Sequence, residues 1–384
     1  MRAKYSLYLS LICASQAISA TFPEQAVRAY ACENCASLSH QTLDTHWSVS
    51  DKRFLEKTRD LREQQTKAYQ VKASFAQLQK GIQLPTKAAG AVIRINPVQK
   101  KSLTPALSIQ KDKQTYTLKE AASLMAQDEA LAGTPFPQNG ILLQLKADLG
   151  SGMFLLTASG NNSPADEFII HVNDIGSSAY FSVGTDKSIY RYGDTLIATI
   201  RTTDSLAESI EAKLNSPDGT QYPLTLKEIS EGVYQGKTRL TDEFNSQGEN
   251  WYVEAEECIV LGSQQLKYQA HSAFSYSLPS AALLEINPSG KQPFQYTAKL
   301  NVATASRYAL QAVLLATDKQ GQKIPVEVAQ SANWLEAGKA RLTLNFSSEL
   351  ANRYSGPFYL AGIQMIDYGQ IKSIFEYNTP ILIS

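Results

Sequence analysis

The feature that most constrains this chain is a strict alternation of apolar and polar side chains in short runs. In the run TLIATI, the side chains of Leu196, Ala198 and Ile200 fall on one face. A period of two places successive side chains on opposite faces of a β-strand, and the apolar face must be buried against a second layer. Gly193, just before this run, can adopt the backbone angles of a tight turn. The stretch therefore predicts an antiparallel sandwich.

The same pattern returns along the chain, with turn-forming residues at intervals of roughly ten, as is typical of sandwiches. The turn SPDG at 216–219 resembles the turn TDKQG at 317–321, which is a weak internal repeat. We therefore expect a mainly β protein. A β-rich domain over residues 50–176 should be followed by two immunoglobulin-like β-sandwich domains, over residues 177–279 and 280–384.

The β-rich domain is expected to contain one or two short helices. The sequence TLKE at 117–120 has the residues of a capping box, which predicts a helix to about Leu131. Asp51–Gln65 is highly charged, and its few apolar residues lie on roughly one side, which predicts a short, mostly solvated helix. From Tyr69 on the side chains alternate as in a strand, although apolar residues repeating every seven positions also allow a helix.

The composition excludes some classes of protein and partner. Of the 384 residues, 43% are hydrophobic, which is enough for several packed cores and argues against a disordered chain. Lys and Arg total 36, and so do Asp and Glu, so the formal net charge is zero. The sequence therefore lacks the basic surface that nucleic-acid binding requires, and we expect no nucleic-acid partner.

The first 20 residues have the layout of a secretory signal peptide. Arg2 and Lys4 supply positive charge, and Leu7–Ala14 is apolar. Small residues then allow cleavage after Ala17 or Ala20. Later segments fall short of the ~20 apolar residues of a membrane span, so we expect none. The sequence predicts an exported protein, periplasmic or secreted, in a compartment that favours disulfides.

Residues 21–49 form a compositionally distinct segment with four candidate metal ligands: Cys32, Cys35, His40 and His46. Thiolate and imidazole groups are the usual zinc ligands, so zinc is the one cofactor that the sequence offers. The spacing is short for a zinc finger, and in an exported protein the Cys-x-x-Cys pair favours a local disulfide. A disulfide, a zinc site and unpaired thiols are all open at this point.

Aromatic residues concentrate in the expected central domain, among them Tyr190, Tyr192 and Trp251. Exposed Tyr and Trp rings would form a binding surface for a glycan or a peptide, because they combine contact area with a polar group. The alternative is that most of these rings lie in the core or in cross-strand pairs. Trp251 and Tyr252 are neighbours in one expected strand and point to opposite faces, so at most one of them is exposed.

Motifs of the common catalytic sites are missing from the sequence. It has no His-Glu-x-x-His, Gly-x-Ser-x-Gly or Gly-x-Gly-x-x-Gly, and we assign no catalytic residue. We therefore favour a non-enzymatic protein that binds or adheres to a protein or glycan partner, or acts in the cell envelope. One alternative is an enzyme whose site, metal-dependent if zinc is bound, lies in the N-terminal domain. The other is an envelope assembly factor or chaperone that pairs an exposed sheet edge with a partner's strand.

The stretch TDKSIYRYGD at 185–194 resembles the opening strand of bacterial Ig-like and macroglobulin-type domains, with Tyr192 where their pattern has Pro. Together with the Cys-x-x-Cys, the strand GAVIRINP at 90–97 and the segment WLEAG at 334–338, it resembles a known protein family. This is an uncharacterised exported gammaproteobacterial family, found in legionellae, with a domain of unknown function and tandem Ig-like domains. The resemblance covers nearly the whole mature chain and implies architecture only, since the family has no assigned catalytic residues.

Overall fold

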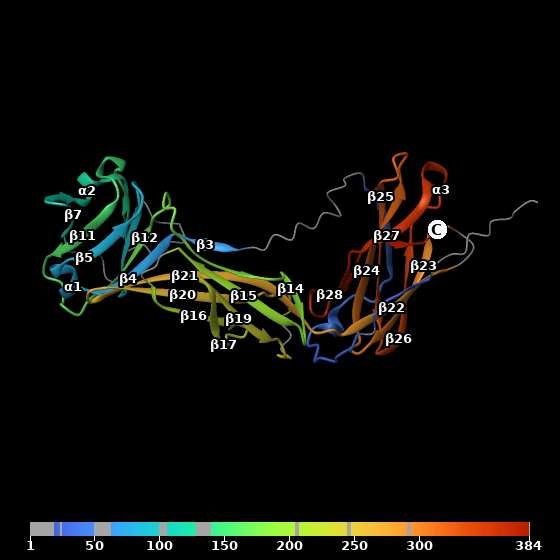
Figure 1. Cartoon of the computed structure of the whole chain (residues 1–384). Helices are drawn as coiled ribbons and strands as arrows, with labels where there is room; N and C mark the ends of the chain where they lie inside the picture. Colours follow the sequence, from blue (N-terminus) through green and yellow to red (C-terminus); the bar gives the residue numbers. More distant parts are fainter. Residues whose placement is uncertain are drawn as a thin grey trace, which may run out of the picture.

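A computed structural model gives the fold of the chain. It describes residues 19–23, 25–49, 63–99, 106–127, 140–203, 207–243, 247–289 and 293–383. The predicted signal peptide up to residue 18 and most of the predicted helix at 51–65 lie outside the described residues. Within them the chain is mainly β with a few short helices, which confirms the predicted fold class. The strands form three sandwiches arranged in a row, and the chain order runs from left to right in Figure 1 for most of its length.

The first sandwich packs two antiparallel sheets around one core. One sheet consists of β4 (Ala68–Ser74), β12 (Glu167–Asn173), β6 (Val92–Pro97), β10 (Ile141–Leu145) and β9 (Ala122–Gln127). The other consists of β5 (Ile82–Thr86), β11 (Gly152–Ser159), β7 (Ala106–Lys111) and β8 (Gln114–Thr117). The strand predicted after Tyr69 is confirmed as β4, so the competing helical interpretation was wrong there.

Two short helices belong to this sandwich, α1 (Phe75–Lys80) and α2 (Leu118–Ala121). The predicted capping box forms, since the Thr117 and Glu120 side chains each accept a hydrogen bond from the other residue's backbone N–H. The predicted extension to Leu131 was wrong, because residues 122–127 pair with β10 instead. A neighbouring strand that needs its backbone groups satisfied outweighs a local helix preference.

The central sandwich continues the first sheet across the border between the two domains. Strands β17 (Gln221–Leu224), β16 (Ala207–Asn215), β20 (Trp251–Leu261) and β21 (Gln264–Ser277) extend that shared sheet, and β14 (Ile189–Arg191) runs parallel to β21. The opposing sheet consists of β18 (Leu226–Ser230), β19 (Val233–Arg239), β15 (Thr195–Thr202), β13 (Phe181–Thr185) and β3 (Gln64–Thr66). Leu196, Ala198 and Ile200 of β15 are fully buried, which confirms the alternation in the sequence.

The C-terminal sandwich also packs one sheet on another. One sheet consists of β1 (Ala20–Thr21), β22 (Ala281–Pro288), β23 (Gln295–Val302) and β26 (Gly338–Asn345). The other consists of β2 (Leu43–Ser48), β25 (Lys323–Leu335), β24 (Ser306–Thr317), β27 (Ser355–Asp367), β28 (Lys372–Tyr377) and β29 (Ile381–Leu382). A short helix, α3 (Leu350–Arg353), precedes β27. The immunoglobulin-like topology stays a prediction for this sandwich and the central one.

The N-terminal segment precedes the first sandwich in the sequence but packs on the last one. β1 pairs with β22, and β2 pairs with β25, so the segment supplies an edge strand to both C-terminal sheets. Phe22 follows β1 and packs edge-on against the rings of Phe375 and Tyr377. The strands β1 and β2 are more than 200 residues away from their partner strands in the sequence, so local patterning cannot predict these pairings.

A buried carboxylate anchors this segment at the border between the central and C-terminal sandwiches. Asp367, at the end of β27, is fully buried. Its oxygens accept hydrogen bonds from five groups: the hydroxyls of Tyr30, Ser280 and Ser306, the backbone N–H of Gly369 and the amide of Gln370. Gln370 also binds both backbone groups of Leu278, in the connection between the two sandwiches. The N-terminal segment, the connection between the two sandwiches and the last sheet therefore all contact the Asp367 carboxylate.

The Asp367→Ala variant should lose on the order of 3 kcal/mol of unfolding free energy, because it leaves several buried donors without an acceptor. Tyr30→Phe removes one donor only and should cost about 1–2 kcal/mol. Denaturant unfolding of the full chain measures both values, with the exposed Asp148→Ala variant as control. A cost for Asp367→Ala no larger than that of the control contradicts the anchoring role.

Candidate functional site

The most distinctive site lies where the first and central sandwiches meet, at the β20–β21 hairpin. The hairpin turns at Gly262 and Ser263 and is longer than the central sandwich needs. Trp251 and Phe274 at its base belong to the central core, whereas Ile259 and Leu266 near its tip belong to the first core. One pair of strands thus contributes to two hydrophobic cores.

Two pairs of residues join the hairpin to the first sandwich. In the β21–β4 ladder, Lys267 lies opposite Gln70, and Tyr268 lies opposite Tyr69. The Gln264 side chain fixes the tip further, since its Oε1 accepts from the Gln83 N–H at 2.9 Å and its Nε2 donates to the Gln83 carbonyl at 2.6 Å. These two hydrogen bonds resemble those of a paired strand. They hold the hairpin tip on β5, in the second sheet of the first sandwich.

A cavity of ≈ 190 Å³ lies on the inner side of this ladder. Apolar and aromatic groups make up most of its wall: Tyr69, Pro85, Met153, Ala179, Tyr180, Ile259, Leu261, Leu266 and Tyr268. The rings of Tyr69 and Tyr268 lie 5.4 Å apart between centroids. The Tyr69 hydroxyl donates to the Pro85 carbonyl at 2.9 Å, and burial raises the pKa of Tyr69 well above its ordinary value. This tyrosine therefore stays neutral and fixed.

Charged side chains also line the cavity, and the acidic ones already have partners. Asp174 is 5% exposed and accepts from the backbone N–H groups of Lys87 and Ala88, at 2.5 and 3.2 Å. Glu257 is 1% exposed and accepts from the Thr202 hydroxyl. A buried carboxylate needs such donors, because an unpaired polar group in the interior is costly. Both carboxylates in the cavity wall are therefore held by donors of the protein itself.

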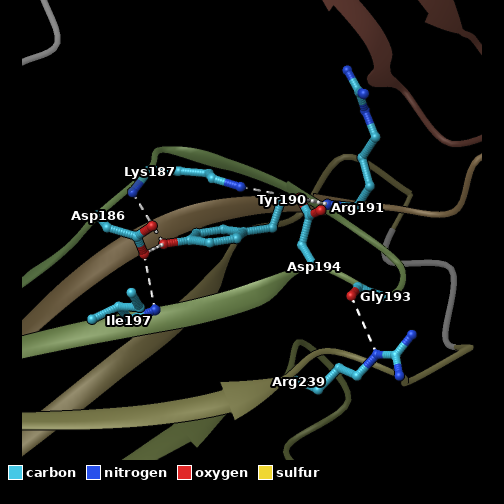
Figure 2. Close-up of polar contacts among 8 residues, drawn as sticks. All are labelled: Asp186, Lys187, Tyr190, Arg191, Gly193, Asp194, Ile197 and Arg239. Atoms are coloured by element: carbon cyan, nitrogen blue, oxygen red, sulfur yellow. Dashed lines mark hydrogen bonds and ion pairs between the residues drawn. The ribbon is translucent and has the colours of Figure 1, made fainter. Parts of the chain in front are cut away.

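The predicted binding surface of Tyr190, Tyr192 and Trp251 is not formed as an exposed face, because Tyr190 and Trp251 are buried in the central core. Figure 2 shows the partner of the Tyr190 hydroxyl: it donates to Asp186 Oδ1 at 2.7 Å, and the exposed Asp186 also accepts from the Ile197 N–H. Burial raises the pKa of this hydroxyl, and the bond to Asp186 adds to the effect.

The remaining aromatic residues have equally definite places. Tyr192 is half-buried, and the Arg28 guanidinium lies 4.1 Å from its ring centroid. The neighbours Trp251 and Tyr252 are 2% and 39% exposed, which confirms that only one of the two faces solvent. These rings therefore serve packing and the attachment of the N-terminal segment.

The structure separates the four candidate metal ligands. Cys32 and Cys35 form a disulfide. His40 stacks on Trp334 with 4.2 Å between ring centroids, and His46 lies on the exposed strand β2. Within the part of the chain that the structure describes, no cluster of three or more His, Cys, Asp or Glu side chains is placed to hold a metal ion. Zinc stays a prediction, which a thiol count can test.

Comparison with known proteins identifies the family. Residues 34–174, 177–277 and 280–384 match, in turn, the N-terminal, central and C-terminal domains of the family described as domain of unknown function DUF4785. The chain belongs to the DUF4785 family. The crystal structure of a DUF4785 family protein from Legionella pneumophila is similar, with 37% sequence identity and a TM-score of 0.75. The match covers 94% of this chain and 99% of that one. No curated protein matches the chain.

Membership in the DUF4785 family confirms the resemblance to a family with a domain of unknown function, whereas its export and its tandem Ig-like domains stay predictions, and membership assigns no activity. None of the helices in the described ranges is long and apolar enough to cross a membrane. Sequence reasoning missed the cavity, because its wall comes from both domains. One signal was present: the two strands of the hairpin span Trp251–Leu261 and Gln264–Ser277, well beyond the usual five or six residues. Length alone does not single out this hairpin, because β24, β25 and β27 are as long and stay within the C-terminal sandwich.

A thiol count distinguishes the disulfide from zinc. In protein without the predicted signal peptide, a thiol reagent added after denaturation should label one cysteine, Cys258, which is free in the structure. After reduction it should label all three cysteines, as counted by mass spectrometry. Three labels without reduction, together with bound zinc, would support the metal site instead.

Truncation near the hairpin tip should destabilise the first sandwich. Leu266 is 1% exposed, so Leu266→Ala is expected to cost about 2–5 kcal/mol through lost burial and the cavity it leaves. The control Val260→Ala, at a 39% exposed position of the same hairpin, should cost less than about 0.5 kcal/mol. Denaturant unfolding of the full chain measures both, and equal costs would show that the tip does not belong to the first core.

Proposed function

We propose that this DUF4785 protein is an exported, non-enzymatic binding protein whose ligand inserts an apolar group into the cavity between the first and central sandwiches. The observation that carries the proposal is an apolar cavity at a domain border whose buried carboxylates already have partners. Ligand sites are typically such cavities, apolar in lining and placed between domains.

The size of the cavity limits the ligand. Drug-sized ligands occupy sites of about 300–1,000 Å³, and an engineered apolar cavity of about 150 Å³ holds benzene. A volume of ≈ 190 Å³ therefore suits one aromatic ring or a short aliphatic chain. The apolar group could belong to a small molecule or project from a protein or glycan partner.

Export is supported by the leader-like sequence of the first 20 residues and by the Cys32–Cys35 disulfide. Disulfides persist in the periplasm and outside the cell, and reducing systems remove them in the cytoplasm. A row of rigid sandwiches also suits a binding role, because it holds a site at a fixed place in the molecule.

Filling the cavity should abolish binding. Small aromatic and short-chain aliphatic compounds are screened by thermal unfolding of the full chain. A ligand at 100 times its Kd stabilises the fold by about 2.7 kcal/mol and should raise the melting temperature by about 5 °C. The Ala179→Trp variant fills the cavity and should lose this response, whereas Val260→Trp, on an exposed face of the hairpin, should keep it.

Two results would count against the proposal. One is a screen in which no apolar compound stabilises the natural chain. The other is a ligand whose effect survives in Ala179→Trp, because such a ligand binds elsewhere.

A further inference from the structure

A second hollow lies on the opposite face of the ladder that borders the apolar cavity. It has a volume of ≈ 400 Å³ and is lined by Gln70, Lys72, Ile169, Ser263, Gln264, Gln265 and Lys267. Gln70 and Lys72 alternate with the inward-facing Tyr69 and Val71 of β4, so they project from the outer face of the shared sheet. The outer hollow and the apolar cavity are therefore separate sites.

Strand pairing fixes the backbone that carries the walls of the outer hollow. Lys267 lies opposite Gln70 across the ladder, and Ile169 lies opposite Lys72 across the next pair of strands. Ser263 and Gln265 flank Gln264, whose side chain is bound to both backbone groups of Gln83. The backbone of the hairpin tip is thus held in place beside the hollow, which reduces the part of the ordering cost that the backbone would add on ligand binding.

The lysines supply positive charge with spare hydrogen-bonding capacity. Lys72 Nζ lies 2.9 Å from Glu167 Oε1, and Lys267 Nζ lies 2.7 Å from Glu256 Oε1. An ammonium group has three N–H donors, and each of these contacts uses one. Both pairs are substantially exposed, and exposed ion pairs are weak, so a ligand carboxylate can bind the same ammonium groups.

Neutral groups complete the hollow. The side chains of Gln70, Ser263 and Gln265 make no hydrogen bond to any residue that the structure describes, so their amide and hydroxyl groups are available. Amides and hydroxyls both donate and accept, as the hydroxyls of a sugar do. Ile169 adds a half-buried apolar contact between these polar groups, suited to the C–H face of a sugar ring.

From this combination we infer that the outer hollow binds an acidic saccharide, with a carboxylate on Lys72 and Lys267 and ring hydroxyls on Gln70, Ser263 and Gln265. Charge-assisted bonds hold the acid group, and the neutral side chains recognise the sugar. The inference goes beyond the proposed function, because it concerns a different face of the sheet and a different ligand class.

The test is calorimetric titration of the full chain, at low salt, with a tetramer of galacturonic acid and with uncharged cellotetraose. The acidic tetramer should bind at least ten times more tightly than the neutral one. Lys72→Gln and Gln265→Ala should each weaken its binding about ten-fold, as expected for the loss of a hydrogen bond to a charged or polar ligand group. Unfolding temperatures should stay unchanged, because both positions are exposed.

Lys299→Gln is the matched control, because Lys299 makes the same kind of cross-strand pair with Glu285 on the C-terminal sandwich, away from the hollow. It should leave the affinity unchanged. The inference is overturned if the acidic tetramer does not bind, if cellotetraose binds equally well, or if Lys299→Gln weakens binding as much as Lys72→Gln. None of these outcomes bears on the apolar cavity, which Ala179→Trp tests separately.

Discussion

Backbone hydrogen bonding continues across the border of the first two sandwiches, and both candidate sites depend on this continuity. The β20–β21 hairpin is buried at its base in one core and at its tip in another. A domain border made of strand pairing and shared core is stiffer than one made of surface contacts, because bending it breaks buried bonds. Both candidate sites depend on that stiffness, since each draws its walls from both sides of the border.

The second border is held differently. Between the central and C-terminal sandwiches, hydrogen bonds to the Asp367 carboxylate hold the segments together. The donors come from several segments, and Tyr30 of the N-terminal segment is one of them. A buried carboxyl group with donors from several segments favours the one arrangement that satisfies it, since unpaired polar atoms in the interior are costly. The N-terminal segment thus helps to hold together the C-terminal sandwich, whose other strands come from the last third of the chain.

Local patterning predicted what depends on local physics. The alternation of Leu196, Ala198 and Ile200 identified a strand with one buried face, and the capping box at Thr117 marked a real helix start. The helix α1 also had a signal that was overlooked, a capping box formed by Ser74 and Gln77. Such features could be predicted because neighbouring residues alone decide them.

Long-range pairing decided the rest. The helix from Thr117 stops after one turn because β10 offers a strand partner, and the edge strands β1 and β2 join sheets formed by the end of the chain. Tyr190 was a candidate surface aromatic, yet its ring packs edge-on against Phe274 in the central core. The two candidate sites could not be predicted, because their residues come together only when two domains share a sheet.

The hairpin and the first sandwich should unfold as a single cooperative unit, with an apolar site and a polar site on opposite faces of the same ladder. Amide hydrogen exchange on the full chain tests that unit most directly. Amides of β4 and of the outer half of β21 should exchange slowly, with the same opening free energy as the first core. The opposite result is rapid exchange at the tip of the hairpin, between Ile259 and Ala270, while the first and central cores stay protected. It would show that the hairpin opens independently of the first sandwich and would contradict the shared unit.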